Sequence, residues 1–353
     1  MMMPGPDGRR GTLMSAREAP PTRPVVTLEQ LLAPVPFREP IVAGAGKSGA
    51  LLERATVDGQ RFVVKYLDAA RDWTVRAAGV EGGACLELWQ RGLLDDLPDC
   101  FDQPIVGVGR GRMQPQGPMV TALLMRDVSP WLVPVDDAVI PLAHHLQFLD
   151  HMASLHARFW EAGPRIDIVS ARARLLELSP SMAAAEAALG SEHLVPRLVG
   201  QGWPLLEQVA PVAAAVVLPL AHDPGPLLAA LARTPQTLVH GNFKLDNLGV
   251  TPDARTVVLD WESSGRGACT GDLAWYLAIN CRRLPQTKEE SIQAYREALE
   301  RRGVDTQPWW QRQLALSLLA GLVSFGWEKA FSGFDDELAW WQDKAVAGVR
   351  WLT

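Results

Sequence analysis

The order of patterns along the chain restricts its fold more than any other feature. Strand-like runs lie between about 39 and 125, and long amphipathic or Ala/Leu-rich runs dominate from about 140 onward. Strands followed by helices are typical of an α+β architecture, whereas a parallel α/β sheet would alternate the two. The sequence therefore predicts a small sheet-rich part and a large helical part that meet near residue 126.

The first part contains a clear hairpin signal. Leu51–Val57 is followed by Asp58-Gly59 and then by Arg61–Leu67, which is the pattern of two strands joined by a two-residue turn. The other elements that we expect are a helix at about 79–92, strands at Ile105–Val108 and Met119–Met125, and helices at Pro141–Trp160 and 171–190.

The composition suits a globular enzyme. Of the 353 residues, 48% are hydrophobic and 21% are charged, which is enough for a packed core. The net charge of −6 argues against a nucleic-acid partner, which would require a basic surface. No run approaches the roughly 18 apolar residues of a membrane helix. The four scattered cysteines show no metal-binding spacing and fit reduced thiols, so we expect a cytoplasmic protein without a membrane partner.

The strongest chemical signal is the run from His240 to Asn247, His-Gly-Asn-Phe-Lys-Leu-Asp-Asn, which Val-Leu-Asp260-Trp-Glu follows. Phosphoryl transfer from a nucleotide needs metal ions that bridge the phosphates and a group that orients the acceptor hydroxyl. The spacing from Asn242 to Asn247 is that of a kinase-type catalytic loop, in which Asn247 and Asp260 would hold Mg²⁺. Lys244 would neutralise charge on the transferring group, or else be a solvated loop lysine.

Gly44, Gly46 and Gly49 form a Gly-x-Gly-x-x-Gly pattern just before the hairpin. In a dinucleotide-binding fold a helix would follow these glycines, but here a hairpin follows and leads to Lys65. This order favours a kinase-type glycine-rich loop over the nucleotide phosphates, with Lys65 contacting the α- and β-phosphates. A P-loop is disfavoured because Ile41 stands where that motif requires its first glycine.

Together these motifs resemble the aminoglycoside phosphotransferase and choline kinase family, which has a protein-kinase-like fold. The family pattern is His-Gly-Asp, four residues and Asn, followed by an apolar-Asp-Trp-Glu segment. The resemblance covers about 40–330. Its further matches, in the family's order, are the interlobe hinge at Leu123–Asp127, the Leu-His-Ala helix at Leu155–Trp160 and the Asp-Leu-Ala helix start at Gly271–Trp275.

The resemblance implies two lobes with ATP and Mg²⁺ between them, although the sequence leaves GTP open. Residues 25–126 would form the nucleotide-binding N-lobe and 127–353 the helical C-lobe with the acceptor cleft, behind a disordered lead at 1–24. The acceptor would be a hydroxylated small molecule or natural product, with a peptide Ser/Thr hydroxyl as the alternative.

The resemblance also implies roles for individual N-lobe residues. Glu81 would form an ion pair with Lys65, with Glu87 as the competing partner. Met125 and Arg126 would contact the nucleotide at the hinge. In the C-lobe, His156 is expected to be a buried structural histidine, and Asp272 is expected to cap its helix and hydrogen-bond the catalytic loop.

The chain departs from the family pattern at Asn242, where the family has the catalytic aspartate. An amide can hydrogen-bond the acceptor hydroxyl but cannot take its proton at neutral pH. The loss of a general base typically costs about 10²–10⁴ in rate. Three interpretations stay open: an engineered substitution, a naturally slow phosphotransferase, or a noncatalytic nucleotide-binding or scaffold protein of the pseudokinase type.

Overall fold

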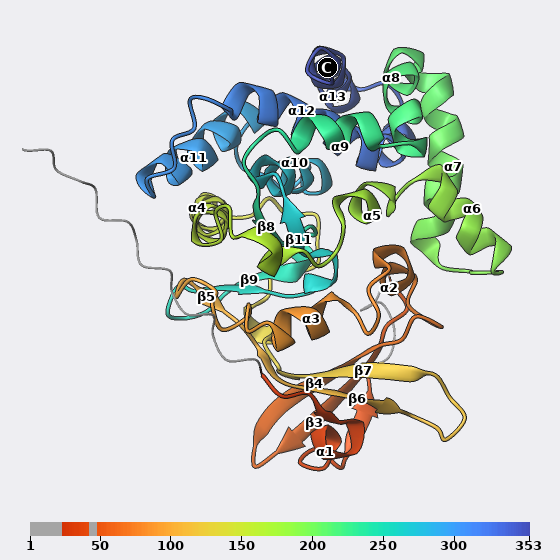
Figure 1. Ribbon diagram of the computed structural model, residues 1–353, viewed down its shortest axis with the longest axis vertical. Helices are drawn as coiled ribbons and strands as arrows, with labels where there is room; N and C mark the ends of the chain where they lie inside the picture. The colour runs from red at the N-terminus through yellow and green to blue at the C-terminus, as the bar shows by residue number, and fades with distance from the viewer. Residues whose placement is uncertain (1–22, 42–47) are drawn as a thin grey trace, which may run out of the picture.

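The computed structural model describes residues 23–41 and 48–353, which form a sheet-rich lobe and a larger helical lobe (Figure 1). The first lobe contains a six-stranded sheet in the order β1-β6-β7-β4-β3-β2. Strand β1 runs parallel to β6, and the other neighbours are antiparallel. The strands are β1 Val26–Thr27, β2 Arg38–Pro40, β3 Leu51–Val57, β4 Gln60–Leu67, β6 Ile105–Arg112 and β7 Met119–Arg126.

The predicted hairpin is confirmed, and it sets the position of Lys65. Asp58 and Gly59 both have positive φ, 50° and 77°, as a tight two-residue turn between twisted strands requires. Side chains alternate along β4, so Val64 and Tyr66 pack into a small core beneath α1 (Leu28–Leu32). Lys65 therefore lies on the opposite face, which is turned toward the helical lobe (Figure 1).

The prediction of a single helix at about 79–92 is wrong. The structure has two short helices, α2 (Trp73–Ala78) and α3 (Ala84–Gln90), separated by a turn. Gly79, Gly82 and Gly83 have φ values of 66°, 81° and 90°, a left-handed conformation that ends a helix. Glu81 consequently lies in the turn rather than in the first turn of a helix.

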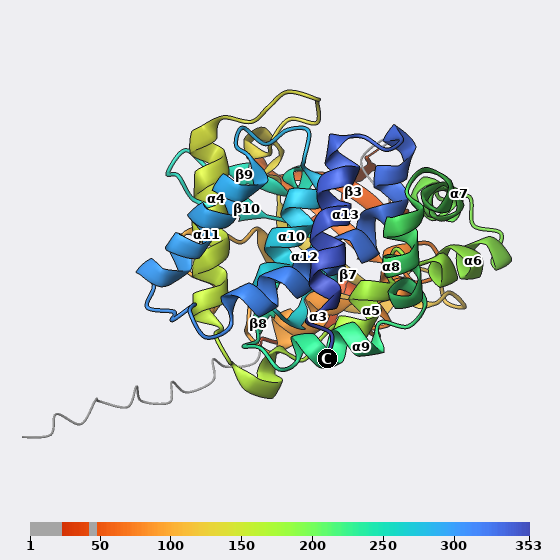
Figure 2. The ribbon, with the colours of Figure 1, turned by 90° about the horizontal axis from the view of Figure 1, so that it is seen from above.

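The second lobe is built around the long helix α12, which packs against α7, α10 and α13 (Figure 2). By length and composition this segment could cross a membrane, but 72% of its apolar window is buried inside the lobe, as in the core helix of a folded domain. The α-helices of the second lobe are α4 Leu142–Arg158, α5 Ala171–Leu176, α6 Pro180–Ala188, α7 Leu194–Val209, α8 Pro211–His222, α9 Gly225–Leu231, α10 Cys269–Ile279, α11 Lys288–Arg301, α12 Trp310–Lys329 and α13 Asp336–Val349.

The helix expected at 171–190 is likewise two helices, α5 and α6. Pro180 cannot continue a helix that precedes it but suits the first turn of a new one. The Ser179 side chain accepts the Met182 N–H and so caps α6. The break lets α5 and α6 take different directions, and α5 comes to lie beside the strands that carry the catalytic loop.

Two small sheets position that loop. Strand β8 (Thr237–Val239) pairs with β11 (Gly265–Gly267), and the β9–β10 hairpin (Leu248–Val250 and Thr256–Val258) pairs with β5 (Phe101–Asp102). The run from His240 to Asn247 therefore connects one small sheet to the other, and Asp260 follows the end of β10.

An ion pair also connects the lobes. Arg76 of α2 donates two hydrogen bonds to Glu186 of α6, Nε to Oε1 at 2.7 Å and Nη2 to Oε2 at 2.6 Å. The bidentate geometry is among the stronger arrangements of an arginine and a carboxylate. It holds the helical edge of the first lobe against the second, where α2 also packs against α5.

Candidate active site

A buried aspartate fixes the start of the catalytic loop. The Asp272 carboxylate, whose side chain is 1% exposed, accepts the backbone N–H of His240 at 2.7 Å and of Gly241 at 2.8 Å. His156 Nε2 lies 3.1 Å from the same carboxylate. Burial alone would raise the pKa of Asp272, but the hydrogen bond with His156 helps to hold this pKa below its ordinary value. The expected bond to the loop is confirmed.

The expected helix-capping role of Asp272 is wrong. The N-cap of α10 is Ala268, and Asp272 lies inside the helix with its carboxylate turned to the loop. Gly241 is required at this contact, because it has φ 77° and a Cβ there would lie 2.3 Å from the Ser263 carbonyl oxygen. His156, whose Nδ1 contacts the Tyr295 hydroxyl at 2.6 Å, is the buried structural histidine that was expected.

His240 ties the catalytic loop to the segment that carries Asp260. Its Nδ1 accepts the Asn242 N–H at 3.2 Å, so Nε2 carries the ring proton and donates to the Leu259 carbonyl at 3.1 Å. Burial lowers the pKa of His240, and the ring is neutral at neutral pH. The histidine therefore acts as a fixed support for the loop.

Asn242, Asn247 and Asp260 form one contact network. The Asn242 amide donates from Nδ2 to Asp260 Oδ2 at 3.0 Å, and the Asn242 carbonyl oxygen accepts from Asn247 Nδ2 at 3.0 Å. The Asn247 backbone oxygen also accepts the Leu259 N–H at 2.9 Å. The structure thus brings together the catalytic and metal-binding positions that the sequence predicted.

Lys65 reaches the same network from the other lobe. Its Nζ lies 2.6 Å from Asp260 Oδ1, across 195 residues of sequence. Burial alone would lower the pKa of Lys65, but Asp260 and Glu262 raise it above its ordinary value. Burial would also raise the pKa of Asp260, and the charges of Lys65 and Lys244 hold it well below its usual range. Both partners are therefore charged at neutral pH.

The predicted ion pair between Lys65 and Glu81 is wrong, because the two side chains do not meet. The Glu81 side chain is 88% exposed and pairs with Arg110 at 2.6 Å. The competing residue Glu87 pairs with Arg91, 2.8 Å away. The glycine-rich turn between α2 and α3 explains the difference, because it leaves Glu81 outside the helix that would have aimed it at Lys65.

Glu262 is a second acidic residue, besides Asp260, whose charge raises the pKa of Lys65. Its side chain is almost fully buried, and its Oε2 accepts the Ala84 N–H at the start of α3 at 2.8 Å. Burial raises the pKa of Glu262, and its charge in turn raises the pKa of Lys65. The sequence signal for Glu262 was its position two residues after Asp260. That position did not predict a contact with α3.

The structure describes only some of the other residues that were predicted to contact the nucleotide. Gly44 and Gly46 lie outside the described residues. Gly49 has φ 91°, and a Cβ there would meet His193 Cε1 at 2.3 Å, so a larger residue would not fit. Met125 borders a small cavity beside Lys65 and Asp260. The Arg126 guanidinium is held by both Asp102 oxygens at 3.0 Å, so its side chain is engaged with β5.

Lys244 faces a carboxylate that sequence reasoning missed. Glu177, at the end of α5, accepts a hydrogen bond from Ser263 Oγ at 3.2 Å, and Ser263 packs against Gly241. Burial raises the pKa of Glu177 to about 7, although Ser263 and Lys244 act in the opposite direction. No sequence motif marks Glu177, because Ser263 and Lys244 come from segments more than 60 residues away.

The oxygen donors fit Mg²⁺ held jointly by this chain and a nucleotide. Asn247 and Asp260 offer amide and carboxylate oxygens, the hard ligands that Mg²⁺ prefers, and one or two such ligands suffice when phosphates supply others. Within residues 23–41 and 48–353 no group of three or more His, Cys, Asp or Glu could hold a metal by itself. The donor set thus suits a metal that arrives with phosphate.

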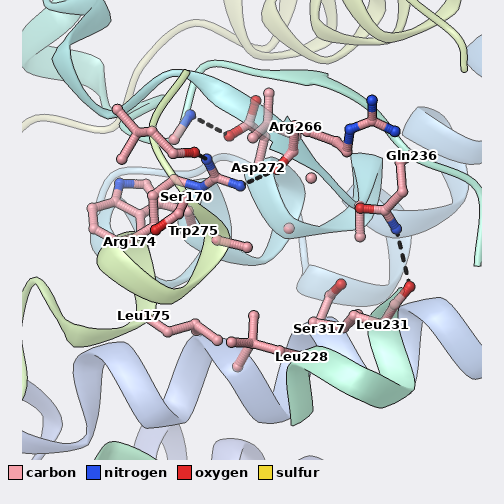
Figure 3. A pocket seen from close by; sticks show the side chains of 18 of the residues that line it. Ser170, Arg174, Leu175, Leu228, Leu231, Gln236, Arg266, Asp272, Trp275 and Ser317 are labelled. Atoms are coloured by element: carbon pink, nitrogen blue, oxygen red, sulfur yellow. Dashed lines mark hydrogen bonds between the residues drawn. The ribbon is translucent and has the colours of Figure 1, made fainter. Parts of the chain in front are cut away.

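A chamber of about 600 Å³ adjoins the catalytic loop (Figure 3). It lies between α5, α9, α10 and α12, and it reaches Gly241 and Asp272 at the loop. The volume falls in the range of about 300–1,000 Å³ that is typical of small-molecule sites. The residue next to Gly241 is Asn242, so a ligand in the chamber would lie beside the predicted catalytic position.

Comparison with known proteins gives one family match and several structural likenesses. The model of the phosphotransferase enzyme family matches residues 114–306. A thermostable mutant of aminoglycoside phosphotransferase APH(4)-Ia shares 15% identity over 92% of this chain and 97% of that chain, with a TM-score of 0.46. Choline kinase LicA from Streptococcus pneumoniae shares 13% identity over 92% and 97%, with a TM-score of 0.47.

A third structure, aminoglycoside phosphotransferase APH(3'')-Id from Streptomyces rimosus, shares 20% identity over 84% of this chain and 97% of that chain, with a TM-score of 0.45. A search of curated proteins finds no significant match.

Proposed function

Because the chain belongs to the phosphotransferase enzyme family, we propose that it transfers the γ-phosphoryl group of ATP to a hydroxyl of a small molecule bound in the chamber beside Gly241. Membership confirms the family resemblance seen in the sequence. The α+β, protein-kinase-like fold is confirmed as well, with its sheet-rich first lobe and helical second lobe.

The observation that carries the proposal is the network of Lys65, Asn242, Asn247 and Asp260. Two lobes contribute to it, and the Lys65–Asp260 contact at 2.6 Å closes it. A kinase-type phosphotransferase places a lysine at the nucleotide phosphates and an asparagine and an aspartate at the metal, and Lys65, Asn247 and Asp260 match these groups, with Asn242 at the position of the base. Their convergence next to a chamber of small-molecule size supports phosphotransfer over an unrelated role.

The chain's own groups have separate roles in this proposal. Lys65 would hold the nucleotide phosphates, and Lys244 would offset the charge of the transferring group. Asn247 and Asp260 would hold Mg²⁺, which when bound supplies positive charge at the phosphates. Because the Asn242 Nδ2 is engaged by Asp260, its Oδ1 is the atom left to accept a hydrogen bond from the acceptor hydroxyl.

Asn242 is compatible with two interpretations. The first is a slow enzyme, and the alternative is a noncatalytic nucleotide-binding protein. Positioning and electrostatics carry much of phosphoryl transfer, and an amide preserves both. The missing proton acceptor would still lower the rate by about 10²–10⁴. Dependence on ATP suits the cytoplasm, where we propose that the protein acts.

The test measures phosphoryl transfer from Mg·ATP to a library of hydroxylated small molecules, with a serine peptide as a further acceptor. The parent, Asn242→Asp and Asp260→Ala are compared. We expect transfer to a small molecule by the parent, a rate about 10²–10⁴ higher in Asn242→Asp, and none in Asp260→Ala.

A thermal-shift assay with Mg·ATP separates the alternatives. Nucleotide at 100 times its dissociation constant should stabilise the parent by about 2.7 kcal/mol. A parent and an Asn242→Asp variant that both show this shift, yet transfer phosphate to none of the acceptors, would support the noncatalytic alternative. The absence of any shift would contradict nucleotide binding itself.

A further inference from the structure

The charges that line the chamber identify a class of acceptor. We propose that the acceptor is an alcohol with a largely apolar body and no positive charge, so that polycationic aminoglycosides are excluded. The inference rests on the proposed function, because it concerns the chamber that we assign to the acceptor. It depends on three observations, which are the apolar walls, the engagement of both acidic side chains, and a guanidinium hydrogen-bonded to carbonyl groups.

The walls of the chamber are mainly apolar. Leu175 of α5 and Leu228 and Leu231 of α9 lie along the lower side of the chamber in Figure 3, and the Trp275 ring of α10 lies at its left. Ala320 of α12 adds to the lining with its short side chain. Burying apolar ligand surface against such walls is favourable, whereas a ligand covered with hydroxyl and ammonium groups would lose its hydration there.

Both acidic residues of the lining already have hydrogen-bond or ion-pair partners in this chain. Asp272 already accepts the N–H groups of His240 and Gly241 and contacts His156. Asp167 forms an ion pair with Arg266, with 2.5 Å between its Oδ1 and the arginine Nε, and its side chain is 55% exposed. An ammonium group held among the apolar walls, away from this exposed aspartate, would therefore lack a free carboxylate partner, and a buried charge without a partner is costly.

The chamber also contains a cation that is bonded to carbonyl groups. Arg174 Nη1 donates to the Val169 oxygen at 2.6 Å, and its Nη2 donates to the Arg266 oxygen (Figure 3). In the described part of the chain no carboxylate is hydrogen-bonded to this guanidinium. Burial lowers the pKa of Arg174 to about 10, despite the nearby Asp272 and Glu177, so the group is charged at neutral pH.

The guanidinium gives the chamber its selectivity. It repels a second cation, tolerates a neutral ligand and attracts an anionic one, and these effects are strengthened in a site of low dielectric constant. The hydroxyl would lie at the end of the chamber formed by Gly241, next to Asn242, with the apolar body between α9 and α12.

The test uses a matched series of naphthalene methanols that carry a methyl, a carboxylate or an aminomethyl group at the far end of the ring, together with kanamycin. Binding to the full chain is measured by calorimetry with Mg·ADP present. We expect the methyl and carboxylate compounds to bind at least tenfold more tightly than the aminomethyl compound, and kanamycin not to bind.

Three variants test where the compounds bind and what selects among them. Ala320→Leu fills part of the space and should weaken the methyl compound at least tenfold, whereas Gln311→Leu, an exposed change on the same helix, should not. Arg174→Gln should reduce the preference for the carboxylate over the aminomethyl compound, and its unfolding curve shows whether the fold survives.

The inference would be overturned if kanamycin or the aminomethyl compound bound as tightly as the neutral one, or if Ala320→Leu bound the methyl compound like the parent. Failure of the proposed function looks different, because it would appear as the absence of a thermal shift with Mg·ATP, or as the absence of phosphoryl transfer to every acceptor while that shift is intact. If the protein bound the aminomethyl compound or kanamycin preferentially and still showed the thermal shift with Mg·ATP, only the assigned acceptor class would be wrong.

Discussion

The Asn242 side-chain amide donates a hydrogen bond of 3.0 Å to Asp260 Oδ2. An aspartate at position 242 would lose this donor and would place a second carboxylate against Asp260. Two carboxylates at such a distance repel each other unless a cation or a proton lies between them. The asparagine is thus matched to Asp260, and restoring the family aspartate has an electrostatic cost that sequence comparison alone does not reveal.

We therefore predict that Asn242→Asp is less stable than the parent when no metal is bound. The loss of a charge-assisted hydrogen bond, together with the new repulsion, should lower the free energy of unfolding by about 1–3 kcal/mol. Mg·ATP should restore most of this difference, because a cation would separate the two carboxylates. Urea unfolding in EDTA and in saturating Mg·ATP measures both effects.

Gln311→Glu is the control for Asn242→Asp, because it makes the same amide-to-acid change at an exposed position. Its stability should remain within about 0.5 kcal/mol of the parent in both conditions. Equal stability of Asn242→Asp and the parent in EDTA would mean that the contact with Asp260 contributes nothing.

A second prediction concerns Glu177 and pH. Its carboxyl is buried enough to raise its pKa from the ordinary 4.5 to about 7, so between these values the folded state holds more protons than the unfolded state. Stability should therefore fall as pH rises from about 4.5 to 7, by on the order of 3 kcal/mol in total, and the loss should persist above pH 7.

Glu177→Gln removes this titration while preserving most of the side-chain shape. The variant should match the parent near pH 4.5 and be more stable above pH 7, which urea unfolding across the pH range would show. Glu81→Gln, at an exposed side chain, is the matched control and should leave the pH dependence of the parent unchanged. A Glu177 variant that follows the parent at every pH would contradict the burial of this carboxyl.

A third prediction separates Lys65 from Glu81 in nucleotide binding. Lys65→Met removes the cation that contacts Asp260, so Mg·ATP affinity should fall roughly 10- to 100-fold, the size expected for one hydrogen bond with a charged group. Glu81→Gln changes an exposed residue that pairs with Arg110 and should leave the affinity unchanged. Calorimetric titration of both variants gives the comparison, and an equal loss in both would restore Glu81 as the partner of Lys65.

The sequence predicted features that depend on local signals and missed those that depend on tertiary packing. Asp58-Gly59 specified the hairpin because both residues accept positive φ, and the spacing from Asn242 to Asn247 marked the catalytic loop. The position of Glu81 failed because three glycines break the helix that was expected to carry it. Glu177 was not predictable, since its neighbour Ser263 comes from another part of the lobe.

The last prediction concerns Asp272, whose carboxylate accepts two backbone N–H groups of the catalytic loop. An asparagine side chain at this position would offer one oxygen, and its amide N–H₂ would face a second donor, so Asp272→Asn should lower the free energy of unfolding by about 3–5 kcal/mol. Hydrogen exchange should show lost protection at the amides of His240 and Gly241. Asp253→Asn, at an exposed aspartate, serves as the control and should stay near the parent. Retained protection of both amides in Asp272→Asn would show that the small sheets, rather than Asp272, hold the loop.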